Sequence, residues 1–201
     1  MALRLHVGCG TVYLDGFVNI DVAVPGYSHL ARERPDLADL NRTTVERYYV
    51  RDESQATLER GPGRPQHCVV DLYASLDALP YEAGTVDEIR SVQVLEHVPQ
   101  PQVPEVLRHW AMLLKPGGMC HVDVPDFEET ARQLIAQPDE PSKDWYYRLV
   151  YGSQKNANAF HRSGFSPARL ERLLREAGFR EVLHLPNTLH FYPACIAEGI
   201  R

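Results

Sequence analysis

The chain has 201 residues, 44% of them hydrophobic, which is enough for one globular domain with a single core. Its 21 Lys and Arg against 27 Asp and Glu give a formal net charge of −6, which excludes the broad basic field that would hold nucleic acid or an anionic membrane. No window approaches 18 consecutive apolar residues and the start lacks a secretory pattern, so we expect a cytoplasmic protein without a membrane segment.

The four cysteines and nine histidines lack the spacing of a metal site. No pair of cysteines forms C-x-x-C, and no pair of histidines forms H-x-x-x-H. We therefore expect reduced thiols and no metal. A metal site could form only from residues that are distant in the sequence.

The first half of the chain contains short apolar runs typical of buried strands. Residues 3–7 run into Gly-Cys-Gly, which predicts a strand entering a tight turn. Residues 17–20 and 67–71 are the next strand candidates, and they end at Asp21 and Asp71. Acidic residues therefore stand at two successive strand ends.

Residues 23–66 are rich in proline and charged side chains. They contain one predicted helix, over residues 44–58, with Asn41 as its cap. A connection of this length inside one compact domain is typical of a lid or an insertion. We expect a single domain over residues 1–201 with 23–66 as that lid or insertion.

The second half of the chain alternates strands with helices. Ser166 and Pro167 are typical of a helix start, and Gly178 of a helix end. The runs at Glu181–Leu185 and Ala194–Ile200 are short and strand-like. The other predicted elements are strands at residues 86–94 and 119–124 and helices at residues 103–114, 126–136 and 166–177.

This alternation predicts an α/β fold with a mostly parallel sheet and helices on its faces. In such sheets ligands bind at the carboxyl ends of the strands. Gly8 and Gly10 would let the backbone approach a ligand there, and Asp21 could accept both hydroxyls of a ribose. The short interval from Gly10 to Asp21 and the lack of a third glycine count against a nicotinamide dinucleotide.

The order and spacing of several segments resemble the class I S-adenosylmethionine-dependent methyltransferases. The nearest likeness is to a small bacterial branch with a shortened helix after the glycine loop and a YGSQ (151–154) to FHRSGFS (160–166) segment. The resemblance implies a Rossmann-like, doubly wound, seven-stranded sheet that ends in an antiparallel hairpin. The segments that carry it are LHVGCG (5–10), NID (19–21), VVDL (69–72), LPYEAGTVDEIRSVQVLEHV (79–98), LLKPGGMCHVDVPD (113–126) and FSPARLERLLREAGF (165–179).

The resemblance also implies S-adenosylmethionine as cofactor and a contact for each strand end. Asp21 would hold the ribose hydroxyls. Two positions depart from the wider family pattern, because His6 replaces an acidic residue and Val12 a glycine. The other implied contacts are Gly8, Cys9 and Gly10 around the methionine moiety, Asp71 and Leu72 beside the adenine, and Gln93 and Val94 on the methionine side.

Three residues are candidates for removing a proton from a methyl acceptor. His97 and Asp126 follow predicted strands, and His161 precedes the last helix, so all three could converge over the cofactor. We favour His161, since an imidazole with an ordinary pKa near 6.5 accepts a proton at neutral pH.

The sequence thus predicts a methyltransferase that acts on an O or N atom of a small-molecule acceptor, with no nucleic-acid partner. Two alternatives stay open: a non-catalytic protein of the same fold that acts with a partner, and a nicotinamide oxidoreductase. The oligomeric state, a homodimer included, stays open as well.

Overall fold

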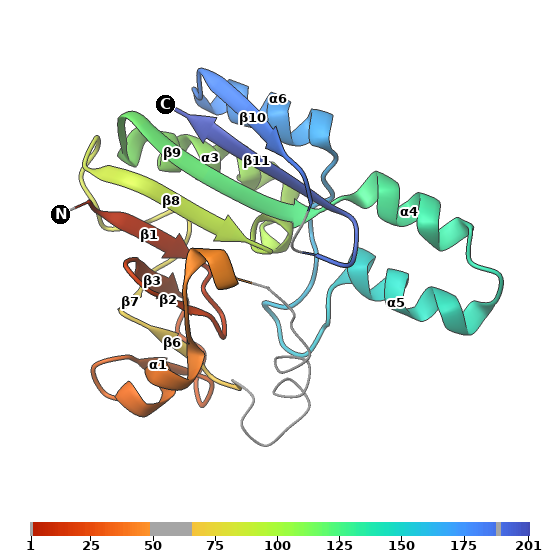
Figure 1. The fold of residues 1–201 in the computed structure, drawn as a ribbon, viewed down its shortest axis with the longest axis horizontal. Coiled ribbons are helices and arrows are strands. Elements are labelled where there is room, and N and C mark those ends of the chain that lie inside the picture. The colour runs from red at the N-terminus through yellow and green to blue at the C-terminus, as the bar shows by residue number, and fades with distance from the viewer. Residues whose placement is uncertain (1, 49–65, 188–189) are drawn as a thin grey trace.

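A mixed seven-stranded sheet forms the centre of the molecule (Figure 1). The computed structural model describes residues 2–48, 66–187 and 190–201. Neighbouring strands are parallel except at β11, which is antiparallel to both of its neighbours. In spatial order the strands are β10 (Glu181–Leu185), β11 (Ala194–Ile200), β9 (Leu114–Pro125), β8 (Val86–Val92), β1 (Arg4–Val7), β3 (Val18–Asp21) and β7 (Leu72–Tyr73). The predicted Rossmann-like fold with its terminal antiparallel hairpin is confirmed.

The main core lies between one face of this sheet and two helices, α3 (Val103–Leu113) and α6 (Pro167–Ala177). Apolar residues of α3 recur at helical spacing and are buried, with Trp110 fully buried at the centre. Its indole N–H donates a 2.9 Å hydrogen bond to the carbonyl of Leu76, which satisfies the one polar atom of that side chain. The predicted helices at 103–114 and 166–177 are therefore confirmed within a residue or two.

Local capping sets the starts of the helices. Asp126 accepts a 3.0 Å hydrogen bond from Glu129 N at the start of α4 (Phe127–Ile135), and Ser166 accepts one from Arg169 N at the start of α6. Gly178 ends α6 in the left-handed conformation that glycine adopts without strain. These boundaries follow from residue type alone, which is why the sequence predicted them.

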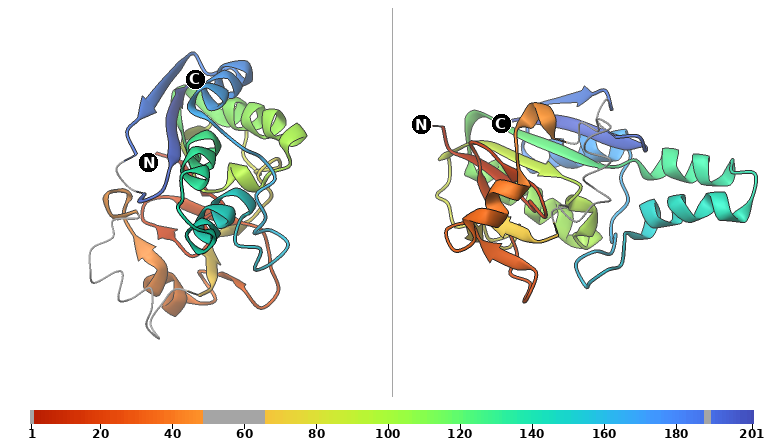
Figure 2. Two further views of the ribbon diagram at one scale, coloured as in Figure 1. Left: turned by 90° about the vertical axis from the view of Figure 1, so that its right-hand side faces the viewer. Right: turned by 60° about the horizontal axis from the view of Figure 1, so that its bottom comes forward.

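Helix α4 and helix α5 (Glu140–Tyr151) form a hairpin that projects from the sheet (Figure 1 and Figure 2). Helix α5 was not predicted from the sequence. Among its residues only Leu149 is buried, so no apolar stripe announces the helix. Its cap, Asp139, accepts a 2.9 Å hydrogen bond from Ser142 N and was the local signal available.

The strand predicted at residues 67–71 does not belong to the main sheet. Cys68–Val70 (β6) pairs with Ser28–Leu30 (β4) in a separate small sheet, and the strand that joins the main sheet is β7. The chain changes partners at Asp71, because Asp71 N donates to the Asn19 carbonyl while Asn19 N donates to the Asp71 carboxylate. The third strand of the main sheet therefore begins later than predicted.

The helix predicted over residues 44–58 is wrong for residues 44–48, the part of it that the structure describes. Asn41 does not cap it but ends another helix, α1 (Pro35–Asn41), and its side chain donates to the His67 carbonyl. A strand, β5 (Arg42–Thr43), pairs with β2 (Tyr13–Leu14), and a short 3-10 turn follows at Val45–Arg47. The rest of the predicted helix, from residue 49, lies outside the described residues.

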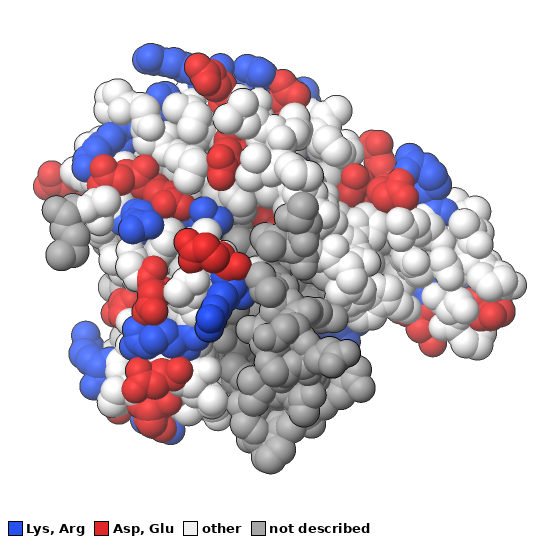
Figure 3. Space-filling model, viewed as in Figure 1, with Lys and Arg blue, Asp and Glu red and all other residues white. Residues whose placement is uncertain are grey.

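Surface charge and helix length concern two kinds of partner, nucleic acid and membrane. Figure 3 shows acidic and basic side chains interspersed on the face in view, without a continuous basic field. No helix among the described residues combines the length and the apolar character needed to cross a membrane.

Candidate functional site

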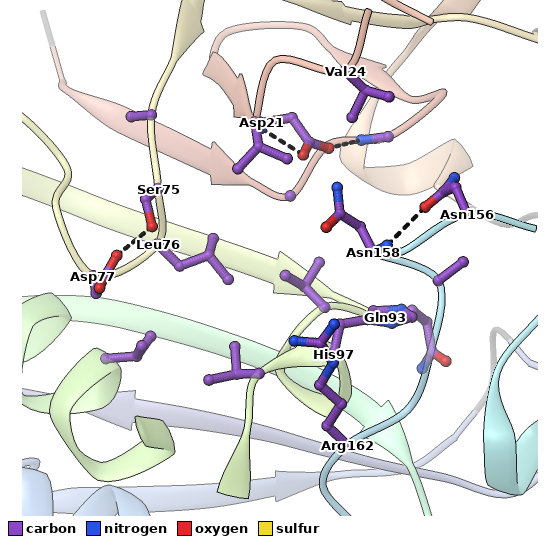
Figure 4. Close-up of a pocket in the computed structure, with 18 of the residues that line it drawn as sticks. Asp21, Val24, Ser75, Leu76, Asp77, Gln93, His97, Asn156, Asn158 and Arg162 are labelled. Carbon is purple, nitrogen blue, oxygen red and sulfur yellow. Dashed lines mark hydrogen bonds between the residues drawn. The ribbon is translucent and has the colours of Figure 1, made fainter. Parts of the chain in front are cut away.

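A cavity of about 420 Å³ opens at the carboxyl ends of β1, β3 and β8 (Figure 4). This volume suits a small ligand, and the position is where ligands bind in parallel α/β sheets. The lining comes from five stretches of chain: the turn after β1, the segment after β3, the segment after β7, the segment from the turn after β8 into α3, and the loop that follows α5.

The turn after β1 presents bare backbone to the cavity. Gly8 and Gly10 both have positive φ, +66° and +53°, which strains other residues. A Cβ on Gly8 would lie 2.5 Å from the side chain of Val94, so the two turns pack directly on each other. A Cβ on Gly10 would meet no atom within 4 Å among the described residues and would enter the cavity instead.

Asp21, the last residue of β3, is held by the same turn. Its Oδ2 accepts a 2.8 Å hydrogen bond from Gly10 N and its Oδ1 a 2.7 Å bond from Val22 N (Figure 4). Each carboxylate oxygen has a second lone pair, so Asp21 can still accept from two hydroxyls of a ligand in the cavity. The backbone thus orients a carboxylate for a diol such as that of a ribose.

The turn after β8 forms the opposite wall. Gln93 has φ +57°, unusual for a residue with a side chain, and its Nε2 donates a 2.7 Å hydrogen bond to Asp123. The other oxygen of Asp123 lies 2.6 Å from His190 Nε2. This chain of bonds holds Gln93 in its strained conformation. Gln93 and Val94 both line the cavity, and their contact with the methionine moiety stays a prediction.

The segment after β7 lines the cavity where the sequence predicted Asp71 and Leu72. Asp71 is bonded to Tyr13 Oη at 2.6 Å and to Asn19 N at 2.8 Å, and neither it nor Leu72 is among the described lining residues. Residues 74–77 take that place. They were missed because the strand end was placed at Asp71, whereas β7 ends at Tyr73.

Glu96, His97 and His161 form a cluster beside the cavity, and His97 is the member that lines it. The 3-10 turn Leu95–His97 carries the first two, and the Glu96 carbonyl accepts hydrogen bonds from Arg162 N and Ser163 N, which fixes His161 nearby. The His97 and His161 rings contact edge to face, with centroids 4.9 Å apart.

Both rings of this cluster are held by backbone carbonyls. His97 Nδ1 donates to Phe160 O at 3.0 Å, and His161 Nδ1 donates to Leu149 O at 2.8 Å. A carbonyl only accepts, so each Nδ1 carries the proton and each Nε2 keeps a lone pair. Both Nε2 atoms lie 4.0 Å from Glu96 Oε1.

Burial shifts all three pKa values of the cluster. It raises the pKa of Glu96 well above its ordinary range and lowers the pKa of His97. Burial, and then the His97 ring, lower the pKa of His161 to about 4. The ordinary imidazole pKa expected for His161 is therefore corrected: at neutral pH both rings are uncharged.

The remaining predicted residues lie outside the cavity wall. Within the described chain Cys9, His161 and Asp126 are not lining residues, although His161 contacts His97, which is one. Cys9 is buried and its thiol faces the Val69 carbonyl. The Asp126 carboxylate caps α4.

Comparison with known proteins decides the family. A family model described as a methyltransferase domain matches residues 7–185. The chain belongs to this family. It is an S-adenosylmethionine-dependent methyltransferase domain, and S-adenosylmethionine is its cofactor.

Individual relatives are distant. An uncharacterized 37.1 kDa protein in a transposon of Streptomyces fradiae is 28% identical over 151 residues, which are 74% of this chain and 41% of that protein. The chain thus spans less than half the length of this curated relative.

Two solved structures are similar in fold. A candidate O-methyltransferase from Nostoc punctiforme has a TM-score of 0.54 and 12% identity, covering 100% of this chain and 52% of its own. Human N-acetylserotonin methyltransferase in complex with S-adenosylmethionine has a TM-score of 0.52 and 14% identity, covering 99% and 47%.

The cavity of this methyltransferase domain fits its cofactor. Asp21 offers two acceptor lone pairs for a ribose, and the open space over Gly10 leaves room for the ligand against bare backbone. The bound cofactor supplies an electrophilic methyl group on a sulfonium.

Proposed function

We propose that this domain transfers the methyl group of S-adenosylmethionine to an O or N atom of a small-molecule acceptor. The observation that carries the proposal is the pairing of two unlike walls in one cavity. Asp21, fixed by Gly10 N, faces the cavity from β3, and His97, with a free Nε2, faces it from the turn after β8.

The two walls have different roles in the proposed reaction. Asp21 and the backbone at Gly8 and Gly10 bind and orient the nucleoside end of the cofactor. The wall of His97, with His161 behind it, provides the lone pairs that assist an acceptor in losing a proton. We assign the Asp126 carboxylate to its cap of α4, because it is already bonded there.

The cavity size supports a small acceptor, and the net charge of −6 with the interspersed charges on the face in Figure 3 argues against nucleic acid as partner. Asn156 and Asn158, in the loop after α5, line the same cavity and could bind polar groups of an acceptor. The Asn156 side chain is held in place, because its Oδ1 accepts a 2.9 Å hydrogen bond from Asn158 N.

Calorimetric titration tests the cofactor half of the proposal. We expect S-adenosylmethionine and S-adenosylhomocysteine to bind and NAD not to bind. Asp21→Ala should weaken S-adenosylhomocysteine binding at least about tenfold, since each lost charge-assisted hydrogen bond contributes roughly 1.5–3 kcal/mol. Asp15→Ala, which removes a half-exposed carboxylate outside the cavity, is the matched control.

Turnover assays test the second half of the proposal, methyl transfer to a small-molecule acceptor. Small phenols, amines, sugars and carboxylates are screened for acceptor-dependent formation of S-adenosylhomocysteine. Cofactor binding with no turnover on any acceptor would favour the non-catalytic alternative, a protein of this fold that acts with a partner.

A further inference from the structure

We propose that Glu96, His97 and His161 bind a divalent transition-metal ion at the acceptor side of the cavity. The three side chains come from two segments more than sixty residues apart, so no sequence spacing announces the site. Their ligand atoms all lie within 4.8 Å of one another.

The buried carboxylate of Glu96 is the first argument. Its side chain is only 2% exposed, and neither Oε1 nor Oε2 accepts a hydrogen bond from any residue that the structure describes. A buried carboxylate without a partner is costly, and proteins pair such groups with a cation or a metal. Two imidazole nitrogens lie 4.0 Å from Glu96 Oε1, and both carry lone pairs instead of protons.

The orientation of the imidazoles is the second argument. Metal-bound histidines usually donate their other N–H to a carbonyl or carboxylate, which fixes the tautomer and the ring. His97 and His161 both do so, through Phe160 O and Leu149 O. Both free Nε2 atoms are thereby directed at the same Glu96 oxygen, as in a preformed set of ligands.

The geometry permits bonds of ordinary length. Ligands of a tetrahedral ion with bonds of about 2.0–2.1 Å lie roughly 3.3 Å apart. Closing the three ligand atoms from their present separations requires shifts of about 1 Å or less each, which side-chain rotation can supply.

The ligand types select the ion. Two imidazoles and one carboxylate suit Zn²⁺, Co²⁺, Ni²⁺, Fe²⁺ or Mn²⁺ better than Mg²⁺ or Ca²⁺, which prefer oxygen ligands. Three protein ligands leave coordination positions open, and His97 lines the cavity, so an open position faces the acceptor.

This placement implies an acceptor with an oxygen donor, an inference that rests on the proposed function. With the ion bound, the Nε2 atoms of His97 and His161 would be ligands and would not accept the proton themselves. A bound hydroxyl would instead be acidified by the ion and lose its proton to water. A lone pair of that oxygen then forms the new O–C bond, and the electrons of the broken S–C bond remain on sulfur.

Cobalt and zinc titrations test the site without any turnover. The 201-residue chain is stripped with EDTA, dialysed and titrated with Co²⁺ by absorption and with Zn²⁺ by calorimetry. We expect a single equivalent to bind, with visible d–d bands and no thiolate-to-cobalt charge-transfer band. Glu96→Gln, His97→Ala and His161→Ala should each weaken binding at least about tenfold.

His29→Ala is the matched control, since His29 belongs to another imidazole pair, 3.3 Å from His67, outside the cavity. It should leave binding unchanged. A thiolate band would instead assign the ion to Cys9 and Cys68, which with Asp21 form the other described cluster of metal-ligand type. That band, an absence of binding, or unchanged affinity in His97→Ala would overturn the proposal.

Activity then separates this inference from the proposed function. If methyl transfer is found, EDTA should abolish it and Zn²⁺, Co²⁺ or Mn²⁺ should restore it. Metal binding without transfer on any acceptor would leave the site intact and count against the function. Transfer that is insensitive to EDTA would overturn the catalytic role of the ion.

Discussion

Two buried histidine networks in this domain differ in how they are completed. In the first, His6 of β1 lies between Asn19 Oδ1, at 2.9 Å from Nδ1, and Tyr48 Oη, at 2.7 Å from Nε2. In the second, each ring of His97 and His161 has one nitrogen bonded to a backbone carbonyl and the other facing Glu96 at 4.0 Å. The first network is closed, and the second is left open at the cavity wall.

The tautomers are the same in both networks, so the difference lies only in the partners. Asn19 Oδ1 also accepts from Leu14 N, while its Nδ2 donates to the Leu14 and Phe17 carbonyls, which fixes the amide. His6 therefore donates from Nδ1, and Tyr48 donates to Nε2.

Burial lowers the pKa of both His6 and His161 to about 4, so charge state does not separate them either. What separates them is an unsatisfied lone pair beside a cavity. A histidine with both nitrogens bonded stabilises the fold, and one with a free nitrogen is available for chemistry.

The largest expected effect is on catalysis by the open network. His161→Ala should lower kcat by about 10²- to 10⁴-fold, whether the ring assists proton loss directly or by holding an ion. The affinity for S-adenosylhomocysteine should stay within about twofold, because Asp21 and Gly10 are untouched. Steady-state kinetics and calorimetry on the same preparation measure both. A variant that keeps its kcat would make His161 a structural residue like His6.

The closed network should respond in stability instead. His6→Ala removes a fully buried ring together with one hydrogen bond of Asn19 Oδ1 and one of Tyr48 Oη. We expect a loss of about 3 kcal/mol in the free energy of unfolding, measured by urea denaturation. The kcat of the folded fraction should be unchanged, and a fall in kcat at full folding would remove the distinction between the two networks.

The stability of the closed network should depend on pH. Because the folded pKa of His6 is near 4 and the unfolded value near 6.5, its stabilising contribution is complete above pH 6.5 and is lost as the pH falls toward 4. The contribution of His6 to the free energy of unfolding should fall by about 1.4 kcal/mol per pH unit through this window.

Urea midpoints at pH 7, 6 and 5, compared between the wild type and His6→Gln, isolate that contribution. Glu96 acts in the opposite sense, since its raised folded pKa gives stability that is lost as the pH rises. The difference between the two proteins cancels the Glu96 contribution. Parallel pH profiles for the two proteins would contradict a neutral buried His6.

The smallest expected effect comes from one atom of the closed network. Tyr48→Phe removes the hydroxyl that donates to His6 Nε2 and leaves a buried acceptor without a partner. We expect a loss of about 1 kcal/mol, seen as a lower urea midpoint with an unchanged m-value. A neutral result would mean that water replaces the hydroxyl, and that this network is less closed than its geometry indicates.

Much of the fold was predictable because its signals are local. Apolar runs give β1, β8 and β9, and single residues such as Asp126, Ser166 and Gly178 set helix ends. The elements that were not predicted lack such a local signal. Helix α5 lacks an apolar stripe, and β6 and β7 are divided by hydrogen bonds between Asn19 and Asp71 that no local pattern encodes.

The candidate site divides in the same way. From the sequence we could predict that Gly8, Gly10, Asp21, Gln93 and Val94 lie together, because the carboxyl ends of parallel strands meet at one edge of the sheet, and all five line the cavity. The chemistry at the other wall was decided by tertiary structure alone. His161 reaches Glu96 only because Arg162 and Ser163 bond back to the turn after β8, and only folding buries a carboxylate that a sequence cannot distinguish from an exposed one.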